Sequence, residues 1–242
     1  MTAFASLALP SALLSAGAAL IAAALAPAPA SAADAHHPLV IELFQSQGCS
    51  SCPPANALLI DWAKRDDVLA LNFAVDYWDS LGWKDIFDSP AYTARQWAYA
   101  RALQRENVYT PQAILNGRAD TTGLDDEELR QLAAKVDRGA GGPAVTVSAG
   151  AATIGAGAAP AGGAEVWLAQ YDPNVLQVAI KRGENAGRTL PHVNIVKRLA
   201  LLGRWSGAPA RFDLPAKDDA RLVDAVLVQG AGQGPILAAA RE

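Results

Sequence analysis

Hydrophobic and polar positions change their pattern near residue 140, which divides the chain into two parts. In the first part, continuous apolar runs at residues 39–44 and 68–75 predict buried strands. Ser89 followed by Pro90 predicts the N-cap and first residue of a helix. The other elements expected here are a strand at 108–116 and an amphipathic helix at 125–136. This alternation of strands and helices predicts an α/β layer with parallel strands.

The second part of the chain contains patterns typical of strands only. They lie at residues 164–170, 176–181, 221–228 and 236–240. Their spacing near ten residues predicts a small β-sandwich. Between the two parts, residues 139–163 are nearly all Gly, Ala, Ser, Thr, Val and Pro, so this segment is either a linker or a pair of thin strands. We therefore expect an α/β domain at 38–138 and a smaller, sandwich-like all-β domain at 164–242.

The first 32 residues carry no charged side chain and are dominated by Ala and Leu. The small residues Ala30, Ser31 and Ala32 offer a cleavage site, so this segment is interpreted as a secretory signal peptide. An uncleaved anchor over residues 7–26 is the alternative, and it is the one membrane association that we expect. The protein is predicted to be exported, to the periplasm or the extracellular space.

Cys49 and Cys52 are the only cysteines in the chain and directly follow the first predicted strand. A disulfide across so short a loop contributes about 2 kcal/mol, against about 5 kcal/mol for a hundred-residue loop. This pattern therefore favours redox chemistry, with an inert disulfide and metal handling as alternatives. Half of a zinc site is not expected, because no second Cys or His pair with the usual spacing follows.

Composition excludes some partner classes. The formal net charge is −4, with 20 basic and 24 acidic residues. This balance gives no reason to expect nucleic acid or an anionic membrane surface as a partner. We expect no cofactor, because no phosphate-binding loop or paired-carboxylate motif is present.

The order strand, CxxC, helix, strand, helix and Thr110-Pro111 resembles the thioredoxin fold over residues 38–138. In thioredoxins, a cis proline in this place packs against the active-site disulfide. The whole chain, with CSSCPPA, DYWDSLGWKD, RGEN and HVN, also resembles a secreted bacterial family known as domain of unknown function 1223. The fold class that the resemblance implies is an α/β thioredoxin-like N-terminal domain followed by the smaller all-β domain.

This resemblance implies a thiol-disulfide oxidoreductase that acts on protein or peptide thiols and disulfides. Cys49 would attack the partner and Cys52, the more buried thiol, would resolve the mixed disulfide. Pro111, after a cis peptide bond, would shape the substrate groove, and the backbone of Thr110 would pair with a bound peptide. Glu42 is either a proton relay for Cys52 or a carboxylate on a strand edge.

Two further segments lie beside this predicted site. Pro53 disfavours the helical backbone conformation in the residue before it. The first helix is therefore expected to begin at Pro53, with Cys52 as its N-cap. The loop after the second strand would either form a wall of a peptide groove or pack under the next helix, and packing is favoured. The groove candidates in that loop are Asp76, Trp78, Asp79 and Trp83.

Two other functional classes stay open at this point. One is a copper-binding or metal-delivery protein, because two soft sulfurs suit Cu(I). The other is a binding module whose disulfide stays closed. A speculative Cu(II) or Ni(II) site would include His36 if cleavage followed Ala33, although a solvated tail is the favoured interpretation.

Overall fold

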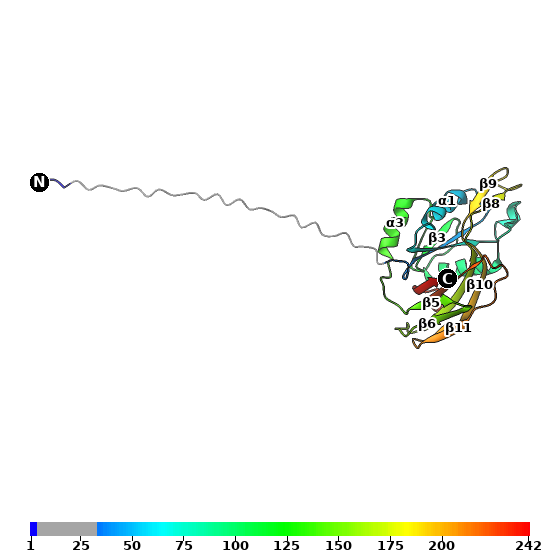
Figure 1. The fold of residues 1–242 in the computed structure, drawn as a ribbon. Coiled ribbons are helices and arrows are strands. Elements are labelled where there is room, and N and C mark those ends of the chain that lie inside the picture. The colour runs from blue at the N-terminus through cyan, green and yellow to red at the C-terminus, as the bar shows by residue number, and fades with distance from the viewer. Residues whose placement is uncertain (4–32) are drawn as a thin grey trace. The chain divides into compact units, whose positions relative to one another are not determined.

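An eight-stranded mixed sheet carries most of the fold in the computed structural model, which describes residues 1–3 and 33–242 (Figure 1). The predicted signal peptide lies, apart from its first three residues, outside the described part of the chain. In spatial order the strands are β13 (Ile236–Arg241), β12 (Val223–Gly230), β7 (Ala164–Asp172), β10 (Ile195–Trp205), β2 (Val68–Ala74), β1 (Leu39–Gln45), β3 (Gln112–Leu115) and β4 (Ala119–Thr121).

This sheet joins the two parts of the chain that the sequence analysis separates. β10 lies parallel to β2, with Ile195 opposite Asn72, and β7, β12 and β13 extend the sheet from there. The predicted α/β thioredoxin-like domain followed by a separate, sandwich-like all-β domain is therefore wrong. The structure instead places β7, β12 and β13, which were expected in a separate sandwich, in the same hydrogen-bonded sheet as β1 and β2. The described residues 33–242 all lie in one compact unit.

Helices cover the two faces of the sheet around β1 and β2. The described helices are α1 (Cys52–Trp62), α2 (Pro90–Ala102), α3 (Asp126–Lys135) and the short 3-10 helix η1 (Asp79–Leu81). Leu59 of α1 packs in one apolar cluster with Ile41 and Leu43, whereas Tyr99 of α2 packs in the cluster with Phe44. Since alternate strand residues face opposite sides, α1 and α2 lie on opposite faces of β1.

The helix starts follow local capping rules. The Ser89 hydroxyl accepts a hydrogen bond from the Ala91 amide at the start of α2, and Pro90 is its first residue, as predicted. α1 begins at Cys52 rather than at Pro53, with Ser51 as its N-cap. This one-residue difference places Cys52 inside the first turn of α1. Among the described residues, no helix combines the length and apolar character needed to cross a bilayer.

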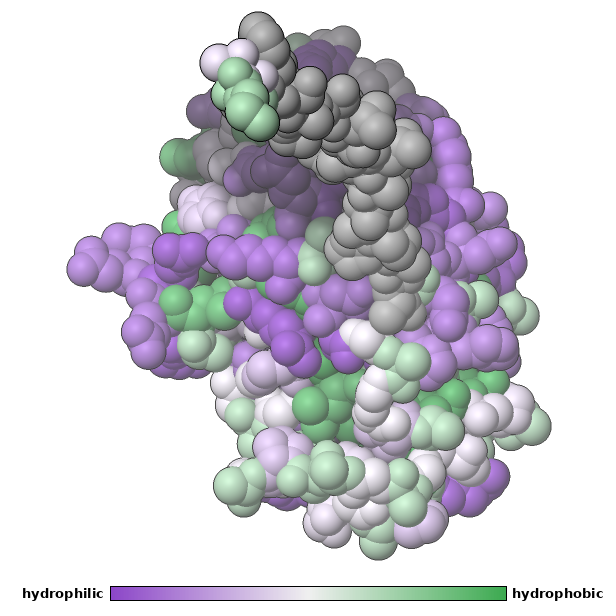
Figure 2. All heavy atoms as spheres, turned by 90° about the vertical axis from the view of Figure 1, so that its left-hand side faces the viewer, coloured by the Kyte–Doolittle hydropathy of each residue, from purple (hydrophilic) through white to green (hydrophobic). Residues whose placement is uncertain are grey.

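The remaining strands form two smaller sheets. They are β11 (Ala210–Asp213), β6 (Ala151–Ile154) and β5 (Val145–Ser148) in one, and β8 (Leu176–Ala179) and β9 (Thr189–His192) in the other. Residues 139–163 thus contain the thin strands β5 and β6. Figure 2 shows mostly white to pale green residues, of intermediate to weakly hydrophobic character, over the lower part of its face, the end where Figure 1 places β5, β6 and β11.

Candidate functional site

The two cysteines form a disulfide between the end of β1 and the start of α1. The α-carbons of Cys49 and Cys52 are 5.4 Å apart. Cys49 has 0% and Cys52 1% of its surface exposed, whereas Ser50 and Ser51 between them are exposed. Both cysteines are therefore equally buried, and their exposure does not support the expected difference between an accessible Cys49 and a more buried Cys52. The bridge itself is covered, and only the loop that it closes faces solvent.

A tight turn positions the bridge. The Cys49 amide donates to the Ser46 carbonyl at 3.1 Å, and the Cys52 amide donates to the Cys49 carbonyl at 3.2 Å. The Ser51 hydroxyl lies 3.3 Å from the Cys49 sulfur and 3.4 Å from the Thr110 carbonyl oxygen, to which it donates. The single hydroxyl hydrogen of Ser51 is thus within reach of both the Thr110 carbonyl and the Cys49 sulfur.

Thr110 and Pro111 lie against the CxxC loop. The Thr110–Pro111 peptide bond is cis, as the sequence predicts. The Trp78 indole nitrogen donates to the Thr110 hydroxyl at 2.8 Å, so Thr110 contacts both Ser51 and the loop after β2. The CxxC loop and the segment that contains Thr110 therefore lie side by side in the fold.

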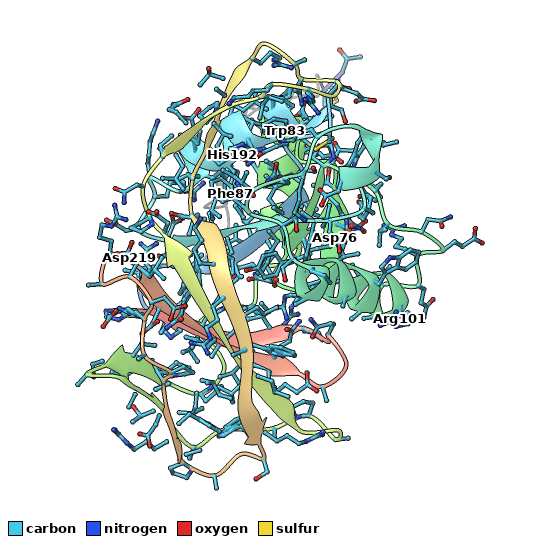
Figure 3. The ribbon with its side chains drawn as sticks, turned by 90° about the vertical axis from the view of Figure 1, so that its right-hand side faces the viewer. Asp76, Trp83, Phe87, Arg101, His192 and Asp219 are labelled. Carbon is cyan, nitrogen blue, oxygen red and sulfur yellow. A yellow bond between two sulfur atoms is a disulfide. The ribbon has the colours of Figure 1, made fainter. Side chains whose placement is uncertain are left out.

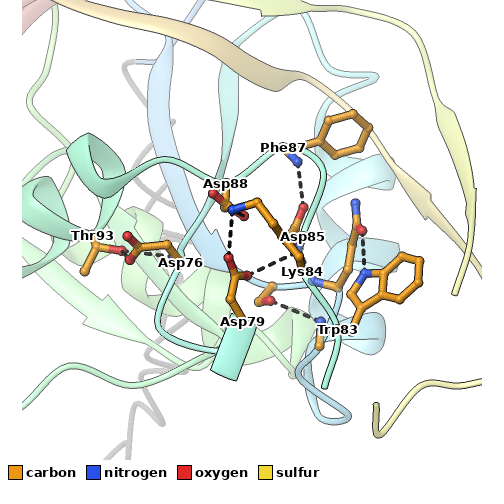
Figure 4. A network of polar contacts seen from close by, with 11 residues as sticks. Asp76, Asp79, Trp83, Lys84, Asp85, Phe87, Asp88 and Thr93 are labelled. Atoms are coloured by element: carbon orange, nitrogen blue, oxygen red, sulfur yellow. Dashed lines mark hydrogen bonds and ion pairs between the residues drawn. The ribbon is translucent and has the colours of Figure 1, made fainter. Parts of the chain in front are cut away.

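The loop at residues 76–88 carries a network of polar contacts (Figure 4) and bonds to Gln47, just before the CxxC loop. The Trp83 indole nitrogen donates to the Gln47 side-chain oxygen at 2.9 Å, and the Gln47 amide donates to the Asp85 carboxylate at 2.7 Å. With the bond from Trp78 to Thr110, both tryptophans contact the site through their ring nitrogens. Their rings also pack against apolar clusters, Trp78 against the main core and Trp83 against the β8–β9 hairpin, which favours the packing interpretation.

The loop's other acids are engaged within the loop or with α2. The Thr93 hydroxyl of α2 donates to the Asp76 carboxylate at 2.6 Å. Asp79 accepts bonds from the Asp85 amide at 3.1 Å and from the Lys84 ammonium at 3.2 Å. These contacts argue against Asp76 and Asp79 as walls of a peptide groove, because their carboxylates already have partners that stabilise the loop.

Asp85 is a site residue that sequence reasoning missed. Its carboxylate accepts from the amides of Gln47 and Phe87, and the residue is 1% exposed. Burial raises the pKa of Asp85 to about 6, the two amide bonds oppose that rise, and the negative charges of Asp88 and Asp79 add to it. No local pattern marks this role, because it depends on β1 and the 76–88 loop meeting in the fold.

His192 is a second buried ionisable group near this loop. Its ring lies beside Phe87, with ring centres 6.1 Å apart (Figure 3). Neither ring nitrogen has a hydrogen-bond partner among the described residues. Burial lowers the pKa of His192 to about 4, so the imidazole is neutral in the folded protein at neutral pH.

Glu42 forms an ion pair with Arg95 of α2, on the face of the sheet opposite to α1. The Arg95 guanidinium donates to its two carboxylate oxygens at 2.5 and 3.0 Å, and the Tyr99 hydroxyl also donates to it. Glu42 and Arg95 are both fully buried. Because Cys52 begins α1 on the opposite face, this geometry argues against Glu42 as a proton relay for Cys52. The carboxylate is part of an ion pair that joins β1 to α2.

The connection between β8 and β9 covers the site from the second half of the chain. The Asn185 side-chain nitrogen donates to the carbonyl oxygens of Gln47 and Cys49, each at 2.9 Å. The Glu184 carboxylate accepts from the Ser50 amide at 3.1 Å. The sequence marks these two residues only as polar groups between strands. Their partners lie more than 130 positions away, which no local pattern reveals.

The described residues also include side chains of the types that ligate metals. None of their His, Cys, Asp and Glu side chains form a group of three or more that could hold a metal ion. The His36 amide donates to the Asp34 carboxylate at 2.8 Å. The speculative site at His36 depends on cleavage after Ala33, which nothing in the structure tests, so it stays a prediction.

Comparisons with known proteins place the chain in a family. It matches the family described as "Protein of unknown function (DUF1223)" over residues 40–229. A search of curated proteins gave no match. The X-ray crystal structure of an Agrobacterium tumefaciens protein is similar, with a TM-score of 0.71, 34% identity, and coverage of 84% of this chain and 92% of that one.

A more distant structure shares the fold alone. HBP35 of Porphyromonas gingivalis has a TM-score of 0.53 at 12% identity, with coverage of 86% of this chain and 75% of that one. The family match extends from β1 through β12 and therefore includes the CxxC loop, the 76–88 loop and the β8–β9 connection that covers them. This chain belongs to the DUF1223 family.

Proposed function

We propose that this protein is an exported thiol-disulfide oxidoreductase that exchanges Cys49–Cys52 with thiols or disulfides of proteins or peptides. The observation that carries the proposal is a disulfide across two intervening residues, set at the first turn of α1 and beside Thr110 and Pro111. A bridge this short contributes little to stability through loop closure. Its value to the protein is better explained by chemistry.

In the proposed reaction, the reduced protein attacks a partner disulfide through the Cys49 thiolate. The Cys49 sulfur bonds to one partner sulfur, and the other partner sulfur leaves with the electron pair and takes a proton. The Cys52 thiolate then attacks the Cys49 sulfur, so the mixed disulfide breaks and the protein bridge forms. Two electrons pass from the protein to the partner, and the reverse sequence oxidises partner thiols.

Two features of the described residues support this assignment of roles. Cys52 is the first residue of α1, where the positive end of the helix dipole favours a thiolate, so Cys52 suits the role of leaving group when a partner thiolate attacks the Cys49 sulfur. The Ser51 hydroxyl is within reach of the Cys49 sulfur. For the substrate, the exposed side chains of Tyr77 and Tyr109 flank Thr110, and we propose that a bound peptide contacts them beside the backbone of Thr110.

Trapping of a partner tests this function. Cys52→Ser should accumulate mixed disulfides through Cys49 in the exporting cell, because the resolving thiol is gone. Cys49→Ser should trap none and serves as the matched control. Adducts are separated on non-reducing gels and identified by mass spectrometry. Absence of adducts in both variants, together with a reduction potential below about −300 mV, would contradict the proposal.

One observation favours the second candidate, a binding module with a permanently closed disulfide. Both cysteines have almost no exposed surface, so neither sulfur is open to attack in this conformation. The two candidates differ in whether the covering segment can move aside. A measured reduction potential within the range of thioredoxin-like exchange proteins, about −270 to −120 mV, would favour the oxidoreductase.

A further inference from the structure

The segment that covers the disulfide is a short loop at the tip of a hairpin. We define it as the cap, residues 180–188 between β8 and β9. These two strands form a sheet of their own, not hydrogen-bonded to the eight-stranded sheet. Figure 1 shows the hairpin beside α1. Beneath it, a small apolar cluster of Val178, Ile180 and Leu190 packs against Trp83 and Phe87.

Asn185 makes the main polar contact between the cap and the disulfide loop. It is 0% exposed, although its neighbours Glu184 and Ala186 are exposed. Both hydrogens of its amide are used on the carbonyls of Gln47 and Cys49. Its amide oxygen accepts from the Arg188 guanidinium at 2.7 Å, which fixes the orientation of the group.

The rest of the cap makes few contacts with the CxxC loop. Glu184 adds one hydrogen bond, to the exposed Ser50 amide. Gly183 has a φ of +76°, and a β-carbon there would lie 3.1 Å from that of Trp83. Gly187 has a φ of +81° with nothing within 4 Å of the corresponding position. Apart from Ile180, which packs in the apolar cluster at the base of the cap, the cap is thus held by a few polar bonds and by the close approach of Gly183 to Trp83.

From these contacts we propose that the cap is a gate over the Cys49–Cys52 disulfide and that Asn185 is the positioning residue that holds it closed. The inference rests on the proposed thiol exchange, whose access it would control. With the cap in this position both cysteines have almost no exposed surface, so neither sulfur is open to an attacking thiolate. When the Asn185 amide releases Gln47 and Cys49, the carbonyl side of the disulfide loop opens to solvent.

Reduction by dithiothreitol probes the gate without any natural partner. One dithiothreitol thiolate attacks the Cys49 sulfur, the Cys49–Cys52 bond breaks, and Cys52 leaves as a thiolate that is then protonated. The second dithiothreitol thiolate displaces Cys49, so the reagent becomes a cyclic disulfide and two electrons reach the protein. The rate of this reaction is followed by acid quenching, alkylation and mass spectrometry of the full chain.

Asn185→Ala should be reduced about tenfold faster than the wild type, because two hydrogen bonds that close the cap are lost. Asn185→Asp should also react faster, since a carboxylate cannot donate to the two carbonyls. Asn174→Ala is the matched control. Asn174 lies before β8, at the other end of the hairpin, and bonds to Asp172. It should react at the wild-type rate.

A second pair of variants leaves Asn185 unchanged. Gly183→Ala should be reduced faster than Gly187→Ala, because both carry an unfavourable positive φ but only the first crowds Trp83. Circular dichroism and the rate of global unfolding in urea confirm that each variant is folded and that unfolding is slower than reduction.

Wild-type rates for Asn185→Ala and Asn185→Asp would overturn the gate, as would equal acceleration in Asn174→Ala. The same holds if Gly183→Ala reacts no faster than Gly187→Ala. The reduction potential, measured on the same proteins by redox titration, reports separately on the proposed function. A bridge too stable for exchange would refute the oxidoreductase, while the rate ratio between Asn185→Ala and the wild type would still report on the cap.

Discussion

At the scale of single residues, Asp85 and His192 are buried ionisable groups with opposite effects on stability. The pKa of Asp85 is raised to about 6, so the folded protein binds its proton more tightly than the unfolded chain does. The pKa of His192 is lowered to about 4, so here the unfolded chain binds the proton more tightly. Phe87 contacts both residues, through its amide and its ring.

The sign of each effect follows from proton linkage. The Asp85 contribution to stability is fully present below pH 4 and is lost as the pH rises through 6. The His192 contribution is fully present above pH 6.5 and is lost as the pH falls towards 4. Each of these changes in pKa corresponds to about 3 kcal/mol. In the wild type the two contributions largely offset each other between pH 4 and 6.

Single substitutions should separate these contributions. Relative to the wild type, Asp85→Asn should gain stability as the pH rises from 4 to 6.5, whereas His192→Gln should lose stability over the same range. Urea denaturation at several pH values measures both. Parallel curves for the two variants and the wild type would show that neither group is titrated differently by folding.

At the scale of elements, Glu42 and Arg95 join β1 to α2 in the core. Arg95 also donates to the Gln229 side-chain oxygen at 3.0 Å, which adds β12 to the contact. The side chains of Glu42 and Arg95 are only 1% and 2% exposed. Removing one partner of such a pair leaves an unpaired buried charge.

Arg95→Met should therefore lower the free energy of unfolding by about 3 to 5 kcal/mol. The double variant Glu42→Gln/Arg95→Met should recover much of this loss, because the buried charge is then absent. Thermal and urea unfolding of the four proteins in the cycle give the coupling between the two residues. Additive losses in the double variant would mean that the ion pair does not join these elements.

Elements with strong local signals were the predictable ones. β1 and β2 are uninterrupted apolar runs, and the N-cap of α2 is visible in Ser89 and Pro90. β10 was missed because its alternation is broken by two register shifts, near Lys197 and Leu202. At the site, the CxxC and Thr110–Pro111 are local motifs. Asp85 and Asn185 act only through partners that tertiary structure brings close.

At the scale of the whole molecule, the two halves of the chain share one sheet and one core. β2 lies between β1 and β10, so its edges are covered by strands from both halves. The largest apolar cluster contains Phe73 and Tyr99 from the first half together with Val196 and Leu227 from the second. The cap also reaches the disulfide from the second half. The surroundings of the disulfide and the sheet therefore both depend on residues from the two halves of the chain.

Because of this shared core, a fragment of residues 33–138 should not fold on its own. Without β10, one edge of β2 loses its partner strand, and Phe73 loses the apolar side chains that cover it. The fragment should show no cooperative urea transition and should bind a hydrophobic dye. The 33–242 chain should unfold in one transition that is identical by tryptophan fluorescence and circular dichroism.

The disulfide of the fragment provides a second measurement at this scale. Without the cap and with its loop unfolded, the bridge in residues 33–138 should be reduced by dithiothreitol at the rate of an exposed peptide disulfide. The intact chain should react much more slowly, because both sulfurs are buried. A fragment that unfolds cooperatively and protects its disulfide as well as the full chain does would restore the two-domain interpretation that the continuous sheet contradicts.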